Sequence, residues 1–336
     1  MARISDILRK ISNKKPDSEG MFLSESLKIG KSIMTILEAK TLYHQTLREV
    51  SRILDSIKEG RTIESDLINS VAEKIVGDLT INKDVLLLLI NNLDLYEKGD
   101  DYIYAHSLNS AILATNIGLG LGLARAEQID LFASSLLHDI GILRVPQDLL
   151  SKPAKLTKEE YDLIKKHPQF GLELLKFIKD PPKSAAEVIY EHHERIDGTG
   201  YPEGKKGNRI SMFAKIVAMV EVYEAITHPR PYHRIVPYEG VRMVVQESKG
   251  FFDPDLVKIF LNQITPYPPG SLVLLNNNQI GMVVNVNEDH PLRPVIQIIF
   301  EADGTPAEGF KKVNLVDSPV LHIKKVLSES NPQVSP

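Results

Sequence analysis

The stretch HHERIDGTGYPEG, His192 to Gly204, places two adjacent histidines at the point where a helical pattern ends. A glycine-rich turn containing a tyrosine and a proline follows directly. The helix opens at SAAE, residues 184–187, which fits a capping box. Neighbouring side chains on a helix are about 100° apart, so both histidines can face one point only near a helix end. The pair is therefore either an ordinary helix terminus or part of a metal site.

The composition narrows the choice of metal ligands. The chain has 336 residues and no cysteine, so a metal must be held by histidine and carboxylate side chains. The net charge of −4 argues against a groove for long nucleic acids. The longest aliphatic run, VLLLLI at residues 85–90, is too short to span a membrane, and the first residues lack the apolar core of a signal peptide. We therefore expect a cytoplasmic protein.

The hydrophobic pattern divides the chain into three regions. Residues 1–100 have apolar positions at helical spacing and no cluster of metal ligands, which predicts an accessory, sensor or dimerisation region. Residues 101–265 predict an all-helical bundle. After TPYPPG at 265–270, short apolar runs separated by turn residues predict strands. The expected fold is thus mainly α, with a small β module and a flexible tail in residues 266–336.

Five histidines of the central region lie near the ends of predicted helices, where a bundle can bring them to one point. Taken singly, each histidine is more often a surface or hydrogen-bonded residue. Asp139 follows a histidine at the end of the apolar helix FASSLLHDIG, and buried polar groups there need partners. A later carboxylate, Glu221, completes the set, although it could be an ordinary helix position; Glu224, one turn further along, is the alternative. The ligands for two octahedral ions would be His106, His138, Asp139, His167, His192, His193 and Glu221.

The order of these motifs resembles the HD-GYP family, a branch of the HD metal-dependent phosphohydrolases. HDIG at 138–141 matches the HD signature, and the stretch at 192–202 contains the Gly-Tyr-Pro tripeptide. The resemblance runs from about residue 101 to 240 in the expected order. The other matching segments are HSLNSAILA (106–114), KPAKLTKEEYDLIKKHPQFG (152–171) and THPRPYHR (227–234).

The resemblance implies hydrolysis of cyclic di-GMP, a bacterial second messenger, to linear pGpG or GMP by a hydroxide that two metal ions share. Iron or manganese is implied for both ions. Asp139 and Tyr201 would be catalytic, and the substrate would be contacted by Tyr201, Arg230 and His233. The implied ligands are His106, His138, Asp139 and Glu221 for one ion, and His167, His192 and His193 for the other, with Asp139 bridging. The N-terminal helices are the candidate surface for a homodimer or a signalling partner.

Four positions depart from the family pattern. Ile142 stands where a lysine commonly meets the substrate phosphate, and Glu221 stands where the family has an aspartate. Tyr102 occupies the position of a glutamate that holds a third metal in some members, so two ions are expected. His233 replaces a second basic residue with a weaker, pH-dependent cation. Three hypotheses remain: a cyclic di-GMP phosphodiesterase of full or reduced activity, a metal-containing cyclic di-GMP receptor, and an enzyme for another cyclic dinucleotide or phosphodiester.

Overall fold

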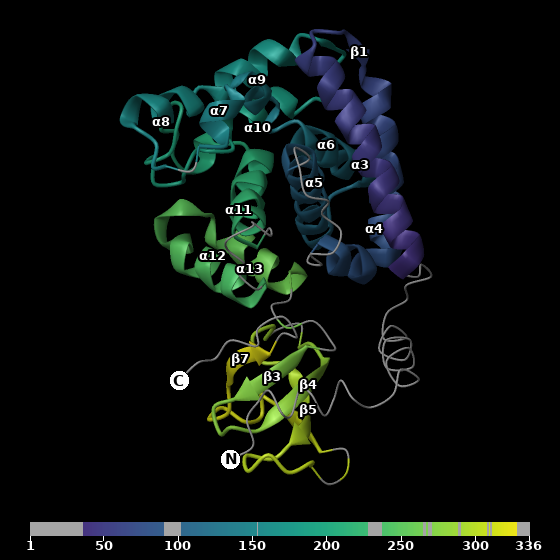
Figure 1. Cartoon of the computed structure of the whole chain (residues 1–336), viewed down its shortest axis with the longest axis vertical. Helices are drawn as coiled ribbons and strands as arrows, with labels where there is room; N and C mark the ends of the chain where they lie inside the picture. Colours follow the sequence, from purple (N-terminus) through teal and green to yellow (C-terminus); the bar gives the residue numbers. More distant parts are fainter. Residues whose placement is uncertain are drawn as a thin grey trace. The chain divides into compact units, whose positions relative to one another are not determined.

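The computed structural model describes residues 36–90, 102–152, 154–227, 237–264, 267, 271–287, 290–307, 309 and 311–327. These residues form two compact units that divide between Gln263 and Ile264 (Figure 1). The first unit is helical and the second is a small antiparallel sheet, so the predicted mainly α fold is confirmed. Among these residues, no helix combines the length and apolar character that crossing a membrane requires.

The helical unit is built around α5, which is buried along most of its length. Helices α3, α4, α6, α11 and α13 all pack against it, and its buried face carries polar residues such as His106 and Asn109 among the apolar ones. Short 3-10 helices, η3 (Ile140–Arg144) and η4 (Gly207–Arg209), connect the longer elements. The α-helices are α3 (Ile36–Lys58), α4 (Ser65–Ile90), α5 (Tyr102–Gly120), α6 (Arg125–Leu136), α7 (Gln147–Leu150), α8 (Lys158–Ile164), α9 (His167–Leu175), α10 (Ala185–Glu191), α11 (Met212–Thr227), α12 (Pro237–Phe251) and α13 (Pro254–Gln263).

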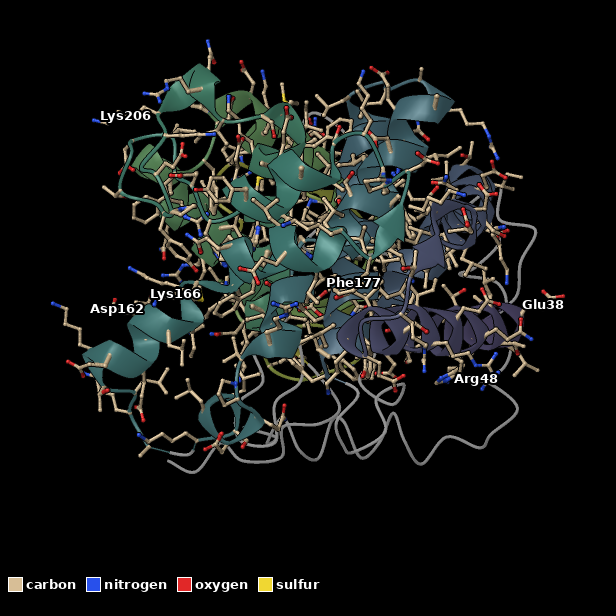
Figure 2. The ribbon with its side chains drawn as sticks, turned by 90° about the horizontal axis from the view of Figure 1, so that it is seen from above. Glu38, Arg48, Asp162, Lys166, Phe177 and Lys206 are labelled. Carbon is tan, nitrogen blue, oxygen red and sulfur yellow. The ribbon has the colours of Figure 1, made fainter. Side chains whose placement is uncertain are left out.

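Helices α3 and α4 share a core with the helices that follow residue 102. A two-residue parallel pairing joins β1 (Ile63–Glu64), between α3 and α4, to β2 (Ile178–Lys179), which follows α9. Phe177 lies beside the turn after α3, 3.6 Å from where a Cβ of Gly60 would stand (Figure 2). The division that the sequence places near residue 100 therefore runs through one compact unit. An accessory or sensor role for the first helices remains a prediction.

Local sequence accounts for several helix ends. Gly60, with φ of +74°, follows the end of α3, as expected for a glycine stop. Thr157 and Glu160 form the predicted capping box at the start of α8, because each side chain bonds the backbone N–H of the other. The capping box predicted at Ser184 is wrong: its hydroxyl donates to Asp130 Oδ2 at 2.6 Å and gives no cap to its own helix. A contact with α6 has replaced the local bond there.

The C-terminal unit is a five-stranded antiparallel sheet in the order β6-β5-β4-β3-β7. Alternate residues such as Val273 and Leu275 are buried, as the pattern of apolar residues predicts. Asn278 takes a positive φ of 67° in the turn between β3 and β4, a conformation that asparagine tolerates. Strand β7 pairs with β3 and was not predicted from the sequence. The strands are β3 (Leu272–Leu275), β4 (Ile280–Asn285), β5 (Val295–Phe300), β6 (Lys312–Asn314) and β7 (Ile323–Leu327).

Candidate metal centre

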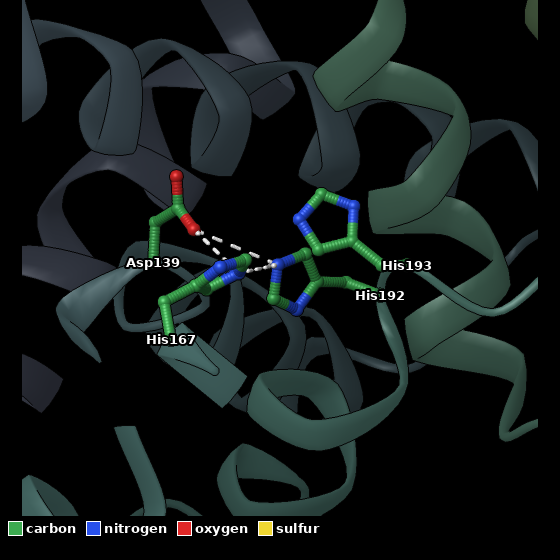
Figure 3. Close-up of side chains that lie close together, drawn as sticks. All are labelled: Asp139, His167, His192 and His193. Carbon is green, nitrogen blue, oxygen red and sulfur yellow. Dashed lines mark hydrogen bonds and ion pairs between the residues drawn. The ribbon is translucent and has the colours of Figure 1, made fainter. Parts of the chain in front are cut away.

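Five histidines and one aspartate from four parts of the helical unit lie together. His106 comes from the first turns of α5, and His138 and Asp139 come from the link between α6 and η3. His167 is the first residue of α9, while His192 and His193 directly follow α10. Figure 3 shows Asp139 facing the rings that α9 and α10 contribute. The ends of these helices thus bring the predicted ligands into one place.

The ligand atoms form two groups that share Asp139. Asp139 Oδ2 is 3.7 Å from His106 Nε2 and 3.9 Å from His138 Nε2. Asp139 Oδ1 faces the other way, 3.2 Å from His167 Nε2 and 3.6 Å from His192 Nε2. A carboxylate placed in this way can bridge two ions. Within each group the ligand atoms lie within 4.8 Å of one another; the groups are His106, His138 and Asp139, and Asp139, His167, His192 and His193.

Three of the histidines are oriented by backbone carbonyls. The Nδ1 atoms of His138, His167 and His192 lie 2.7, 2.9 and 3.0 Å from the carbonyl oxygens of Ser135, Ile164 and Val188. A carbonyl oxygen can only accept, so each Nδ1 must carry the proton and donate it. The Nε2 atom of each ring is therefore turned towards Asp139 and is the atom that a metal would bind.

The polar atoms at this centre fit a divalent metal. His138 Nε2, Asp139 Oδ1 and Glu221 Oε2 are buried and have no hydrogen-bond partner among the described residues. Burying such atoms without partners is costly. Imidazole nitrogens and carboxylate oxygens are ligands that borderline divalent ions accept, and ligation would satisfy these atoms.

The protonation states suit ligation. Burial lowers the pKa of His138 to about 3 and also lowers the pKa of His167 and of His193. These rings are therefore neutral at pH 7, and neutral imidazole is the form that binds metal. Burial alone would raise the pKa of Asp139, but the neighbouring His138 and His167 hold it well below its usual range. The aspartate is thus ionised and able to bridge.

Glu221 is the predicted ligand that lies outside both groups. Its Oε2 is 3.6 Å from Nδ1 of His193, a member of the second group, whereas the family pattern pairs it with His106 and His138. Burial raises the pKa of the Glu221 carboxyl. The side chain stands at the edge of the centre, and its role as a ligand of the first ion remains a prediction.

Glu224, considered from the sequence only as a substitute ligand, bonds instead to a predicted ligand, His106. Its Oε2 accepts a hydrogen bond from His106 Nδ1 at 2.5 Å, and its Oε1 accepts one from Asn109 Nδ2 at 2.9 Å. Burial lowers the pKa of His106, but the Glu224 carboxylate overcomes this effect and raises it to about 9. The helical spacing placed Glu224 on nearly the same face as Glu221, but it gave no sign of the contact with α5.

Tyr201 lies against the second group. Its ring stacks on the His193 ring, with centroids 4.6 Å apart. It meets the His167 ring edge to face, with centroids 6.3 Å apart. Its backbone N–H donates to the carbonyl oxygen of His193 at 3.2 Å. Burial raises the pKa of Tyr201, so the phenol keeps its proton at neutral pH. The tyrosine of the Gly-Tyr-Pro turn is thus beside the centre, while its part in catalysis and substrate binding remains a prediction.

The turn that carries Tyr201 is held by two buried carboxylates. Glu194 accepts hydrogen bonds from the backbone N–H groups of Glu203 and Lys205 at 2.8 and 2.9 Å. Glu191 accepts from the Lys205 ammonium at 2.8 Å and from the backbone N–H of Ser211 at 2.7 Å. Sequence interpretation did not single out either glutamate, although both flank the histidine pair.

Four other positions were singled out from the sequence: Tyr102, Ile142, Arg230 and His233. Tyr102 stacks on the His106 ring, with centroids 5.8 Å apart, and so presents a phenol where some family members have a carboxylate. Ile142 is half-buried in η3, three residues after Asp139. Arg230 and His233, the predicted substrate contacts, lie outside the described residues.

Comparisons with known proteins agree with this geometry. The HD domain family matches residues 89–256, and a KOW domain associated with the HD domain matches residues 272–334. A cyclic di-GMP phosphodiesterase of Pseudomonas aeruginosa is 32% identical over 270 residues, which cover 80% of this chain and 64% of that protein. A 3'3'-cGAMP-specific phosphodiesterase of Vibrio cholerae is 33% identical over 147 residues, which cover 44% of this chain and 32% of that protein. The match therefore spans less than two thirds of either relative.

A solved structure shares the fold. An HDGYP protein from Bdellovibrio bacteriovorus superposes with a TM-score of 0.54 at 19% identity, over 74% of this chain and 79% of that one. The HD domain match includes the HDIG motif, both clusters of ligand atoms and the Gly-Tyr-Pro turn. With half of its residues matched to that domain, this chain belongs to the HD domain family.

Proposed function

We propose that this protein is a metal-dependent phosphodiesterase that hydrolyses cyclic di-GMP to linear pGpG or GMP. The observation that carries the proposal is the position of Asp139, whose two carboxylate oxygens face two separate groups of histidines. Two divalent ions in such a site would polarise the phosphate and supply a water nucleophile at neutral pH. The name of the Pseudomonas relative, a cyclic di-GMP phosphodiesterase, supports the substrate.

The ligands divide between the two ions as the clusters do. His106, His138 and Asp139 would hold one ion, and His167, His192 and His193 would hold the other, with Asp139 shared. Glu221, which lies outside both clusters, would join the first ion, as the family pattern implies. Nitrogen and oxygen donors without thiolates suit iron or manganese. The Nδ1 hydrogen bonds to backbone carbonyls hold the rings in fixed orientations, so no rearrangement is needed when substrate binds.

Tyr201 and the cations after α11 would complete the reaction site. The protonated Tyr201 phenol, beside His193, can donate a hydrogen bond to a phosphate oxygen or to the departing ribose oxygen. Arg230 and His233 would contact the substrate, Arg230 through a phosphate. Half-buried Ile142 offers no such hydrogen bond, which predicts weaker binding of the diester than a lysine would give.

Location and assembly are part of the same proposal. Cyclic di-GMP is a bacterial second messenger, so we place the protein in the cytoplasm. We also propose that the N-terminal helices provide the surface for a second copy or a signalling partner.

A second substrate has an observation in its favour. The Vibrio relative, at 33% identity over its matched part, is specific for 3'3'-cGAMP, another cyclic dinucleotide. The metal centre acts on the phosphodiester that both messengers share, so the bases must be told apart elsewhere. Competition between the two dinucleotides therefore decides the substrate.

The test is anaerobic purification with metal analysis, followed by incubation with cyclic di-GMP, 3'3'-cGAMP and cyclic di-AMP and separation of the products. We expect two ions per chain and conversion of cyclic di-GMP to pGpG or GMP. Binding of cyclic di-GMP by fully loaded protein without turnover would identify a receptor instead. Preferential cleavage of 3'3'-cGAMP would transfer the proposal to that substrate.

A further inference from the structure

His106 is held differently from His138, His167 and His192. The Nδ1 atoms of His138, His167 and His192 donate to neutral backbone carbonyls, each within four residues of the ring. His106 Nδ1 instead lies 2.5 Å from a carboxylate oxygen of Glu224, which is 118 residues away in the sequence. A local contact therefore orients these three rings, whereas the packing of α5 against α11 orients His106.

The contact to Glu224 continues into helix α3. The second carboxylate oxygen of Glu224 accepts from the side-chain amide of Asn109 at 2.9 Å. The amide oxygen of Asn109 accepts from the hydroxyl of Tyr43, also at 2.9 Å. The exposed fractions of Tyr43, Asn109, Glu224 and His106 are 2, 1, 3 and 4%, so water cannot readily replace any of these bonds. One buried chain of hydrogen bonds thus joins α3 to a metal ligand.

The direction of every bond in this chain is fixed. An ionised carboxylate only accepts, so Glu224 requires the N–H of His106 on one oxygen and the NH₂ of Asn109 on the other. The Asn109 amide oxygen must then face α3, where the Tyr43 hydroxyl donates to it. With Nδ1 bonded to Glu224, the ring of His106 turns Nε2 towards Asp139 Oδ2, 3.7 Å away, and Nε2 is the atom that a metal would bind in place of its proton. The same arrangement of a carboxylate behind a metal-binding histidine makes the ring a stronger ligand.

We propose that Glu224 is a positioning residue for the metal ligand His106, and that Asn109 and Tyr43 connect this control to helix α3. The proposal rests on the metal centre of the proposed function. It gives the N-terminal helices a defined role. A change at α3 that breaks the Tyr43–Asn109 bond loosens Glu224 and reorients His106. The affinity for the ion that His106 binds then falls. The affinity for the second ion, whose histidine ligands come from α9 and the end of α10, changes little.

Helix α3 also offers a matched control. The Tyr104 hydroxyl donates to Asp55 Oδ1 at 2.5 Å, which likewise joins α5 to α3 by a tyrosine hydrogen bond. That bond ends on a half-buried aspartate and not on a residue that bonds a ligand. Tyr43→Phe and Tyr104→Phe therefore remove the same chemical group between the same two helices, and only the first acts on His106.

The experiment is a titration of metal-free protein with Mn²⁺, which resolves the affinities of the two ions without measuring turnover. We expect Glu224→Gln to lower the affinity for one Mn²⁺ ion by about 10- to 100-fold, as for other residues that orient ligands. The affinity for the other ion should not change. Tyr43→Phe should weaken the same ion by about 2- to 10-fold, the equivalent of one hydrogen bond. Tyr104→Phe should leave both ions unchanged.

A spectroscopic measurement separates positioning from general stability. The Nδ1 proton of His106 should give a strongly downfield NMR signal in the metal-free protein, because it bonds a buried carboxylate. We expect Glu224→Gln to shift this signal upfield, and Tyr43→Phe to shift it less, while Tyr104→Phe leaves it in place. If Glu224→Gln does not fold, the comparison of Tyr43→Phe with Tyr104→Phe still decides the matter.

The two proposals fail in different ways. If the unaltered protein binds two ions and Glu224→Gln changes neither affinity, the positioning role is overturned and the proposed function stands. Equal effects of Tyr43→Phe and Tyr104→Phe on the Mn²⁺ affinities overturn the link to α3. If the unaltered protein binds no divalent ion, both the proposed function and this inference fail.

Discussion

Gly141 lies directly against the backbone of His167. A Cβ atom at Gly141 would stand 1.8 Å from the carbonyl oxygen of His167 and 2.6 Å from the backbone nitrogen of Gly171. No larger residue allows η3 to come this close to the start of α9. The contact brings together the two predicted ligands on either side of it, where Asp139 Oδ1 is 3.2 Å from His167 Nε2. The glycine of the HDIG motif is therefore a spacing element of the metal centre.

We expect Gly141→Ala to push α9 away from η3 and to lower the free energy of unfolding by about 1–3 kcal/mol or more, as overpacking does. Urea unfolding and metal analysis measure the two effects, and bound metal should fall with stability. Gly77→Ala in α4 is the control, since its Cβ would meet only Arg125 Nη2 at 3.9 Å. That change should be neutral or stabilise by about 0.5–1 kcal/mol. Equal free energies of unfolding and equal metal contents of the two variants would show that the close contact does not support the centre.

His167→Ala should remove one of the two ions, because His167 belongs only to the group that also contains His192 and His193. The metal content of dialysed protein measures this loss. His290→Ala, at an exposed position in the C-terminal unit, should keep both ions. Retention of two tightly bound ions in the His167 variant would disprove the assignment of ligands.

Glu221→Asp should keep metal bound, whereas Glu221→Ala should weaken it, because aspartate can coordinate and alanine cannot. The buried Oε2 of Glu221 has no hydrogen-bond partner among the described residues, so it is available to a metal. Metal content and the Mn²⁺ affinity of both variants give the answer. Full binding by Glu221→Ala would identify Glu221 as an ordinary helix residue.

Ile142→Lys should raise the affinity for the dinucleotide or the rate of its cleavage. A charge-assisted hydrogen bond to phosphate contributes roughly 1.5–3 kcal/mol, or about 10- to 100-fold. The gain should shrink at high salt, because ions screen a partly solvated charge. Leu143→Lys, at the next half-buried position of η3, controls for added charge alone. The idea fails if metal-loaded Ile142→Lys gains nothing, or if both lysine variants gain equally.

Glu194→Ala should loosen the turn that carries Tyr201. The change leaves the N–H groups of Glu203 and Lys205 without their carboxylate, at a cost of about 1–3 kcal/mol. Hydrogen exchange of residues 198–206 should accelerate, and KM should rise more than kcat falls, while both ions stay bound. Glu203→Ala, which removes an exposed side chain from the same turn, should not change exchange. Unchanged exchange in the Glu194 variant would mean that the turn is held by other contacts.

The sequence predicted the ligand histidines because their signals are local. His138 and Asp139 adjoin the end of α6, and His192 and His193 adjoin the end of α10, so spacing along the chain was enough. Whether these side chains act as ligands stays a prediction.

Features that depend on distant parts of the chain were missed. Ser184 has the right spacing for a cap, but Asp130 of α6 offered its hydroxyl a stronger, charged partner. Glu224 could be placed on a helix face, yet its bond to His106 depends on how α11 crosses α5. Strand β7 contains two lysines, Lys324 and Lys325, that interrupt the alternation expected of a strand.

The pairing of Ile63 with Ile178 limits how this chain can be recombined with others. Two residues of parallel sheet tie the connection between α3 and α4 to the segment after α9, the helix that begins with His167. A chimera that joins a foreign sensor at residue 101 would remove the partner of Ile178 and the hydroxyl of Tyr43 along with the apolar faces of two helices. A graft made ahead of Ile36 keeps all of them, so the transferable unit of this protein includes α3.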